Sequence, residues 1–428
     1  MGEAGTLLVP NLKPELATSI EFGTDLGFFQ NRVRFEGTYF VVDNVNQIIS
    51  NVPDAWSSGY RASNLNIGLT QSVGWEFTLG GVPVRNREWM WDLSVNVTRV
   101  RVTLKELDPN VPEIDKVNFW DEANASSWAK VGDKIGDLYD RPVLRVDNTS
   151  SPYHGYPIIS ESNRRWEPVA GDDNKIKVGN YNPNFVLGLN STLVYKSFAL
   201  NFTLDWRNGG KFISQTERYQ REYGASKHSY SKAAINPQGR EGKELRDWLV
   251  ANEDKYIKSD NFTYVGGPTR EMGGIYNTDV APAGWDGCFV PGVFAVRDAQ
   301  GVITGYVENL GEAETTRLRS YAGMSPWNFA SHAMFPSDYI KLREVSLTYQ
   351  VPQSIVDRIG GIKVLAVSVY SRNIMLWTKA KVGIDPERAF QHSASTGGRR
   401  GTQFMQGIEL YNLEPWVMPV GVKLNLTF

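Results

Sequence analysis

The chain has 428 residues, a formal net charge of -2 at pH 7 and a mean hydropathy of -0.35. This charge balance lacks the basic excess of a phosphate-binding surface, so we expect no nucleic-acid partner. Cys288 is the single cysteine, which excludes an internal disulfide framework and a cysteine-based zinc cluster.

The sequence has no segment suited to span a membrane as a helix. Its longest apolar stretches, such as Val364–Val367, hold only a few residues, whereas a spanning helix needs about 20. The first ten residues do not resemble a signal peptide, because their apolar run ends at Pro10. Aromatic residues make up 12% of the chain and glycine is abundant, which suits a sheet protein with one apolar face and long polar loops.

Apolar and polar residues alternate over segments about as long as a transmembrane β-strand, roughly 9 to 11 residues. The first such segment places Ile20, Phe22 and Leu26 on one face, and a partner strand begins at Arg32. Further paired segments follow in chain order; they are 75–79 with 91–98, 185–193 with 198–207, 340–349 with 365–372, and 420–428. The residues on either side of Arg343 follow opposite phases, which predicts a β-bulge there.

The connections between these strands alternate in length. Short turns are predicted near 27–31, 85–88, 195–197 and 352–361, and the longest loops near 102–181 and 211–336. A membrane barrel with turns on one side and binding loops on the other has this pattern. A soluble β-sandwich or propeller also alternates. We favour the barrel because the strands are long and because tryptophans lie near their ends, namely Trp75, Trp89, Trp91, Trp206, Trp377 and Trp416.

Several of these segments resemble the C-terminal barrel portion of the SusC/RagA family of TonB-linked (TonB-dependent) outer-membrane transporters. The most specific is 337–349, SDYIKLREVSLTY, which is similar to the family's ASYIKLREVSLSY. The segment 371–379, SRNIMLWTK, is similar to GRNLFLWTK, and GIDPE follows at 383–387. Weaker matches, including NLKPE at 11–15 and the terminal Phe428, extend the resemblance over the strands but not the long loops.

The resemblance implies an all-β fold, an antiparallel transmembrane β-barrel of 22 strands, of which we count about nine here. Residues 1–428 would then be the C-terminal part of the barrel, with the signal peptide, TonB box and plug domain absent. About nine strands do not close an ordinary bacterial barrel, which uses an even number, so we expect a fragment that is not competent alone.

The implied function is uptake of oligosaccharides or peptides across the cell outer membrane. The implied partners are a SusD-like surface lipoprotein, the TonB-ExbB-ExbD complex acting through the missing N-terminal region, and membrane lipid. Two other functions remain open from the residues: a surface glycan-binding or adhesion module without transport, and a soluble glycan-processing enzyme with paired carboxylates.

The residues themselves indicate no catalytic site, no enzyme and no cofactor. The four histidines, His154, His228, His332 and His392, are far apart and form no His-Glu-x-x-His pattern. Acidic clusters at 172–174 and 108–115 offer oxygen ligands for calcium but lack EF-hand spacing, so we interpret them as solvated loops.

The candidate ligand-binding residues are loop aromatics, because flat rings stack on sugars or hold peptide side chains at little entropic cost. They are Trp120, Trp128, Tyr139, Tyr153, Tyr156, Trp166, Tyr219, Tyr223 and Trp285. Loop aromatics also pack loops together, and we expect only a minority of these to touch ligand.

Overall fold

A computed structural model describes most of the chain. The described residues are 6–8, 12–53, 62–66, 68–107, 116–122, 124–160, 166–223, 225–226, 287–288, 292–308, 316–317, 327–390, 406–411 and 416–428. Trp285, His228, His392 and the acidic cluster at 108–115 therefore lie outside the described residues.

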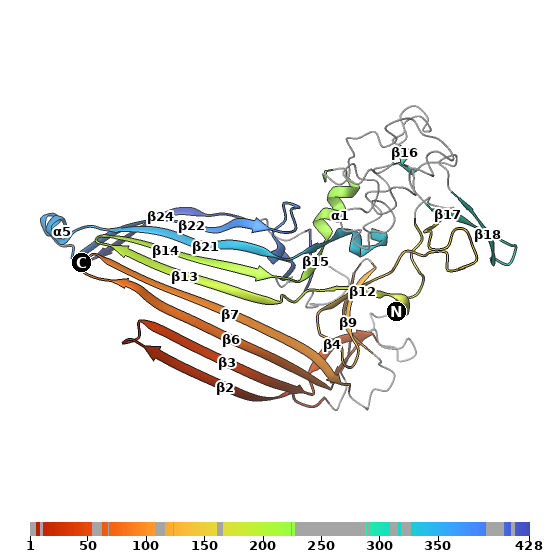
Figure 1. Cartoon of the computed structure of the whole chain (residues 1–428), viewed down its shortest axis with the longest axis horizontal. Coiled ribbons are helices and arrows are strands. Elements are labelled where there is room, and N and C mark those ends of the chain that lie inside the picture. The colour runs from red at the N-terminus through yellow and green to blue at the C-terminus, as the bar shows by residue number, and fades with distance from the viewer. Residues whose placement is uncertain are drawn as a thin grey trace.

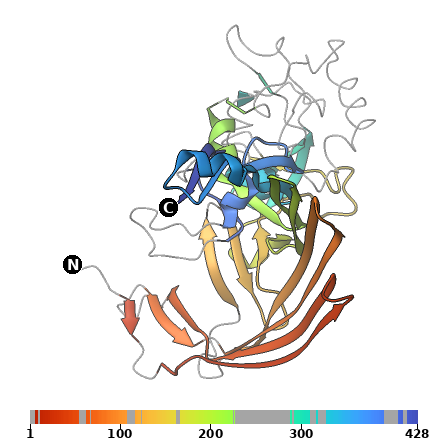
Figure 2. The same ribbon diagram turned by 90° about the vertical axis from the view of Figure 1, so that its left-hand side faces the viewer.

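The largest element is a nine-stranded antiparallel sheet in which strands neighbour one another in chain order, as the alternation pattern predicts (Figure 1). Nine strands are also the number counted from the sequence. The strands are β2 (Leu16–Phe28), β3 (Val33–Val45), β6 (Leu69–Arg85), β7 (Trp89–Glu106), β13 (Phe185–Tyr195), β14 (Phe198–Asn208), β21 (Tyr339–Gln350), β22 (Val364–Thr378) and β24 (Val420–Thr427). The sheet bends into a wall rather than lying flat, and it does not close on itself (Figure 2).

Four short connections lie together at one end of the wall, called here the turn end, where the C-terminus also lies (Figure 1). The connection between β13 and β14 has only two residues, and Lys196 adopts a positive φ of 51° there. Between β21 and β22 the predicted turn contains the short helix α5 (Gln353–Ile359), which ends at Gly360 with φ of 69°. All the long connections lie at the opposite end, called here the loop end.

One face of the wall is apolar from strand to strand, and we call it the outward face. Register places Leu187 of β13 beside Trp206 of β14 and Val97 of β7, and Trp206 beside Ile340 of β21. On the two edge strands this face is open, with Phe22 70% and Val422 72% exposed. A soluble protein seldom leaves so continuous an apolar surface in water.

Aromatic residues bound this apolar face at both ends. At the turn end, Trp89 packs on Tyr195 with ring centroids 4.1 Å apart, and Phe198 on Tyr349 at 4.8 Å. At the loop end, Phe185 packs edge-on against Trp206 at 5.1 Å. The eight residue-to-residue steps from Phe198 to Trp206 span about 26 Å along the strand at ~3.3 Å per residue. Two aromatic girdles enclosing such a band are typical of an outer-membrane barrel.

The predicted bulge lies at Arg343. Thr203 of β14 pairs with Glu344 of β21, but the next residue, Leu204, pairs with Leu342, so Arg343 has no opposite partner on β14. Because of this extra residue, the apolar side chains before and after the bulge point to the same side of β21. The outward face therefore carries Ile340, Leu342, Val345 and Leu347. Arg343 itself is turned to the other face, where it meets Asp205.

The long connections hold more structure than the sequence predicts. The connection between β7 and β13 contains a four-stranded sheet of β8 (Val117–Glu122), β9 (Ala125–Ala129), β10 (Asp137–Asp140) and β12 (Ile176–Asn180). The other strands are β1 (Thr6–Leu8), β4 (Ile48–Pro53), β5 (Ala62–Asn66), β11 (Ile158–Ile159), β15 (Lys211–Ser214), β16 (Gly287–Cys288), β17 (Val293–Arg297), β18 (Ile303–Glu308), β19 (Thr316–Arg317), β20 (Met334–Pro336) and β23 (Ile408–Glu409). Apolar side chains of β8, β9, β10, β15, β20 and β23 bury a core of their own, which includes Trp120, Leu138 and Ile213.

The remaining helical elements are α1 (Gln215–Glu222) and the 3-10 turns η2 (Asp172–Asn174), η4 (Ala330–Ala333) and η5 (Pro386–Phe390). No helix in the described part of the chain is long and apolar enough to cross a membrane.

Candidate functional site

A network of ion pairs joins the inner face of the wall to the last long connection. Lys341 of β21 donates to Asp385 Oδ2 and to Glu387 Oε2, both at 2.5 Å. Arg343 binds the same Glu387 carboxylate through two nitrogens at 2.7 Å, and also pairs with Asp205 of β14. The IKLREV and GIDPE segments, which the sequence analysis singled out separately, therefore meet through their charged side chains.

The network holds η5 against the wall. Lys341 is almost completely buried, with 1% of its side chain exposed, so its ammonium group depends on the two carboxylates for solvation. Burial by itself raises the pKa of Glu387, but hydrogen bonds from Arg343 and Lys341 outweigh this effect and lower the pKa to about 2. Glu387 is therefore ionised throughout the physiological range.

The same connection also supports α1. Glu409 of β23 is fully buried and accepts hydrogen bonds from the hydroxyls of Ser214 and Thr216, each at 2.7 Å. Arg388 of η5 pairs with Glu409 at 3.3 Å. Ser214 also caps α1, because its hydroxyl accepts from the Glu217 backbone N–H. The position of α1 is thus linked through η5 to the wall.

An aromatic cluster, made of Tyr219, Tyr223, Trp327 and Tyr411, surrounds the exposed side of α1. Tyr219 is its centre, with ring centroids 4.6 Å from Tyr411, 5.0 Å from Trp327 and 6.4 Å from Tyr223. Tyr223 is 65% exposed and Tyr411 58% exposed. Trp327 is fixed by a hydrogen bond from its Nε1 to Glu222 at 3.1 Å. Two accessible rings are thus held on α1 and the segment beside it. Figure 1 shows α1 beyond the loop end of the wall.

The structure places the predicted loop aromatics that it describes in three groups. Trp120, Trp128, Tyr139 and Trp166 are each at most 8% exposed. Trp128 stacks on Tyr139 at 3.4 Å, and Trp120 donates from Nε1 to the Gln406 carbonyl, so these rings pack the loops together. Tyr153 and Tyr156 pack edge-on against each other, with ring centroids 5.8 Å apart, and both pack against a small core that includes Val146 and Ile158. Among the predicted aromatics within the described ranges, only Tyr219 and Tyr223 join an accessible cluster, and whether any of these residues binds ligand stays a prediction.

Two members of the aromatic cluster were missed by the sequence reasoning. Trp327 and Tyr411 lie in different long connections, 105 and 188 residues from Glu222 and Tyr223 respectively. Trp327 could have been added to the pool simply as a loop tryptophan. Tyr411 had no local signal, because its neighbours give no indication that β23 packs beside α1.

The histidines and acidic clusters do not form a chemical site in the described residues. His332 is buried, which lowers its pKa well below the ordinary value, while His154 lies exposed in a turn. Asp173 pairs with Lys116 at 2.9 Å. Across the described ranges, no three His, Cys, Asp or Glu side chains are grouped to hold a metal ion.

Comparison with known proteins gives consistent matches. The profile of the family "TonB dependent receptor-like, beta-barrel" matches residues 2–137. TonB-dependent receptor P26 of Formosa agariphila is 22% identical over 98% of this chain, and TonB-dependent receptor SusC of Bacteroides thetaiotaomicron is 23% identical over 59%. The structure of the RagAB peptide importer in the open-open state aligns over 98% of the chain with a TM-score of 0.53 and 16% identity.

The chain spans 26% of the length of that SusC, 35% of P26 and 35% of the RagAB chain. Its wall, apolar outward face and two aromatic girdles define it as part of a β-barrel of the outer membrane. The chain resembles a portion of a SusC/RagA-like TonB-dependent receptor. Proteins of this kind are receptors and transporters, not enzymes.

Proposed function

We propose that the chain belongs to a TonB-dependent importer that takes up oligosaccharides or peptides across the outer membrane, together with a SusD-like lipoprotein. Residues 1–428 supply the C-terminal part of the barrel wall, and the plug and TonB contact come from sequence outside it. The chain is not competent for transport by itself, because its nine-stranded wall leaves both β2 and β24 without an outer neighbour in the described structure.

The observation that supports this most directly is the ion-pair link from the wall to the aromatic cluster. Every membrane β-barrel has such a wall, so the wall alone does not indicate this function. Here Lys341 and Arg343 form ion pairs with η5, Arg388 of η5 pairs with Glu409, and Glu409 accepts a hydrogen bond from Ser214 at the start of α1. A ligand that contacts Tyr223 or Tyr411 therefore contacts a segment that is linked by ion pairs to the inner face of the wall. That arrangement suits capture at the loop end followed by passage through the lumen.

The chemistry of the ligand is limited to two classes. Exposed tyrosine rings stack on sugar faces and also hold peptide side chains, and their hydroxyls add a hydrogen bond in either case. Of these two classes, the structural neighbours favour peptides, since RagAB is a peptide importer. A SusD-like lipoprotein would cover the loop end, where the described loops rise beyond the wall.

The test is an uptake assay in cells that carry a Tyr223→Ala/Tyr411→Ala double substitution at the chromosomal locus. Fluorescently labelled oligosaccharides and labelled peptides are offered separately, with and without active TonB. Each lost ring contact is worth about 1 kcal/mol, so we expect the apparent affinity for the transported class to fall about 25-fold. Uptake in the parent strain should disappear without TonB.

A matched control is Val302→Ala, which trims a side chain that is 60% exposed but lies in the β17–β18 hairpin, outside the aromatic cluster. This variant should import like the parent. Binding of either probe without any TonB-dependent uptake would contradict the importer and favour a surface adhesion module. Unchanged uptake in the double variant would remove the aromatic cluster from ligand recognition while leaving transport intact.

A further inference from the structure

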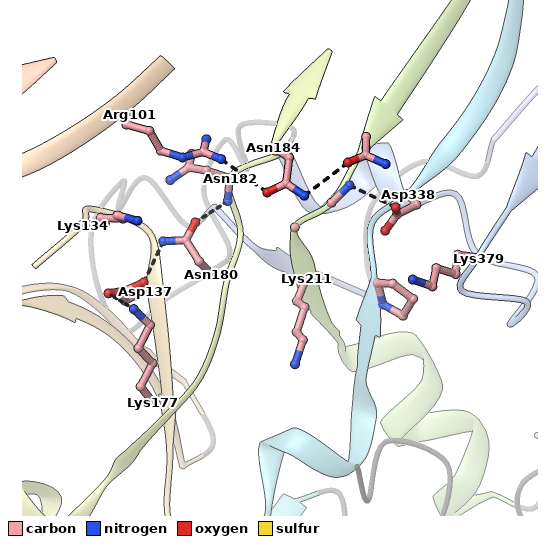
Figure 3. Close-up of a pocket in the computed structure, with 14 residues that line it drawn as sticks. Arg101, Lys134, Asp137, Lys177, Asn180, Asn182, Asn184, Lys211, Asp338 and Lys379 are labelled. Atoms are coloured by element: carbon pink, nitrogen blue, oxygen red, sulfur yellow. Dashed lines mark hydrogen bonds and ion pairs between the residues drawn. The ribbon is translucent and has the colours of Figure 1, made fainter. Parts of the chain in front are cut away.

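A polar pocket of about 500 Å³ lies at the loop end of the wall (Figure 3). It is lined by the ends of wall strands and by the first loop segments beyond them. Its cations are Arg101, Lys134, Lys177, Lys211 and Lys379, which come from β7, the connection before β10, β12, β15 and the segment after β22. Four asparagine side chains add neutral hydrogen-bonding groups.

The pocket has a surplus of positive charge. Its two carboxylates are already engaged: Asp137 accepts from Lys177 at 2.6 Å and from Asn180 at 2.7 Å, and Asp338 accepts from the Gly209 N–H at 3.0 Å. Five cations therefore face two carboxylates, and in the described part of the chain Lys134 and Lys379 form no ion pair. Such a site attracts an anion with several acceptor oxygens.

Lys211 adds a second reason to expect an anion. Its ammonium group donates to the Val178 carbonyl at 2.9 Å, and burial lowers its pKa from the ordinary value. A partly buried cation gains solvation when a bound anion replaces lost water. In Figure 3 Lys134 and Lys379 lie on either side of Lys211.

The strand register places this pocket on the outward face of the wall. Arg101 follows Val97 on β7 by four residues and pairs with Val73, so it shares the face of the apolar band. Asn208 pairs with Phe185, two residues beyond the pair of Trp206 with Leu187 on that face. Arg207, of opposite phase, instead donates to the Tyr181 carbonyl and stacks on Phe390 of η5 at 3.8 Å.

The pocket also lies at a defined height. The loop-end girdle passes through Phe185, Trp206 and Trp377, and Trp377 pairs with Ile340 in the same row as Trp206. Asp338 and Lys379 lie two residues beyond Ile340 and Trp377, away from the apolar band, and Asn208 is level with Phe185 at the outer edge of the girdle. Aromatic girdles lie at the level where lipid tails meet headgroups, so the pocket faces the headgroup layer.

We propose that this pocket binds the phosphorylated headgroup of an outer-leaflet lipid. Three observations agree on this occupant: the surplus of cations, the outward face and the position just beyond the girdle. An imported ligand passes through the lumen, on the other side of the wall. Basic pockets at the membrane boundary recognise phosphorylated headgroups by the same charge complementarity. This site needs only the barrel in its membrane and does not depend on the transported substrate.

The test uses the receptor purified in detergent from native outer membranes. Mass spectrometry of the intact protein measures retention of diphosphoryl lipid A, with dephosphorylated lipid A and inorganic phosphate as comparison probes. We expect retention of the diphosphoryl form only. Because each cation near an anionic lipid surface contributes about fivefold, Lys134→Gln/Lys379→Gln should weaken retention about 25-fold.

Lys105→Gln is the matched control, because Lys105 is an exposed lysine on the same strand as Arg101 but does not line the pocket. It should retain lipid like the parent. Equal retention of dephosphorylated lipid A, or full retention by the double variant, would overturn the proposal. Tight binding of inorganic phosphate that is unaffected by lipid would show a free-anion site instead and would also overturn it.

Discussion

Replacing Lys341 with methionine tests whether the ion-pair network fastens η5 to the wall. Methionine keeps much of the buried aliphatic stem but removes the ammonium group that Asp385 and Glu387 share. Glu387 keeps its two hydrogen bonds to Arg343. Asp385, with 5% of its side chain exposed, keeps only the Glu387 backbone N–H at 3.0 Å, so a buried carboxylate is left without a cation.

Breaking a buried ion pair by removing one partner costs about 3 to 5 kcal/mol. We expect the lower value, about 3 kcal/mol, because Arg343 still neutralises Glu387. If this free energy is lost from local opening of η5, the open population rises about 100-fold. The double variant Lys341→Met/Asp385→Asn should recover most of the loss, since it removes the unpaired carboxylate as well.

Hydrogen exchange of the purified receptor measures this directly at the η5 amides. The Arg388 N–H donates to the Asp385 carbonyl at 3.1 Å, so its exchange reports opening of the turn. Arg372→Met is the control, because its pair with Glu344 has both side chains about half exposed and should contribute at most about 1 kcal/mol. Equal η5 exchange in the Lys341 variant and the control would refute the reasoning.

The remaining predictions concern pH, the outward face and a loop-end turn. Because the pKa of Glu387 is about 2 in the folded protein against an ordinary 4.5, its stabilising effect is complete above pH 4.5 and declines as the pH falls toward 2. Between pH 4.5 and 2 the Tm of the parent should therefore fall more than the Tm of Glu387→Gln, which shows only the decline that other titrating groups cause. Ser191→Ala leaves the Trp91 indole N–H, now 3.0 Å from the Ser191 hydroxyl, without a partner on the apolar face and should lower stability by about 1 kcal/mol in heat-modifiability gels, whereas Ser191→Thr should not. Gly210→Ala adds a Cβ 2.6 Å from the Ser337 hydroxyl at a φ of 86°, so we expect a loss of about 1 to 3 kcal/mol and less folded receptor in the outer membrane; parent-like yield and Tm would contradict this backbone conformation.

The wall could be predicted from the sequence because a β-strand has a period of two residues. Alternation at Phe198–Trp206 is enough to give the strand and its apolar face. The short turn at 195–197 then gives its pairing with the strand before it. The bulge at Arg343 could be predicted for the same reason, since an inserted residue is the ordinary way for one strand to change phase and keep one buried or lipid-facing side. These are local properties of short segments.

The loops could not be predicted in this way, because their contacts join residues far apart in the chain. A tryptophan such as Trp120 gives no local indication that it is 1% exposed, and Tyr223 gives none that it is 65% exposed. Lys341 and Asp385 are 44 residues apart, and Ser214 and Glu409 are 195 apart. The IKLREV and GIDPE motifs could both be recognised in the sequence, but only the folding of the loop between them brings Lys341 and Asp385 together.

The sequence by itself determined the strands and their apolar face, since both follow from the two-residue period of a membrane wall. Only the tertiary structure decided which loop aromatics are buried, where η5 is fastened and that five cations meet in one pocket outside the girdle. The physical reason is that burial and charge neutralisation depend on neighbours, and in long connections the neighbours are set by the packing of the loops rather than by adjacent residues.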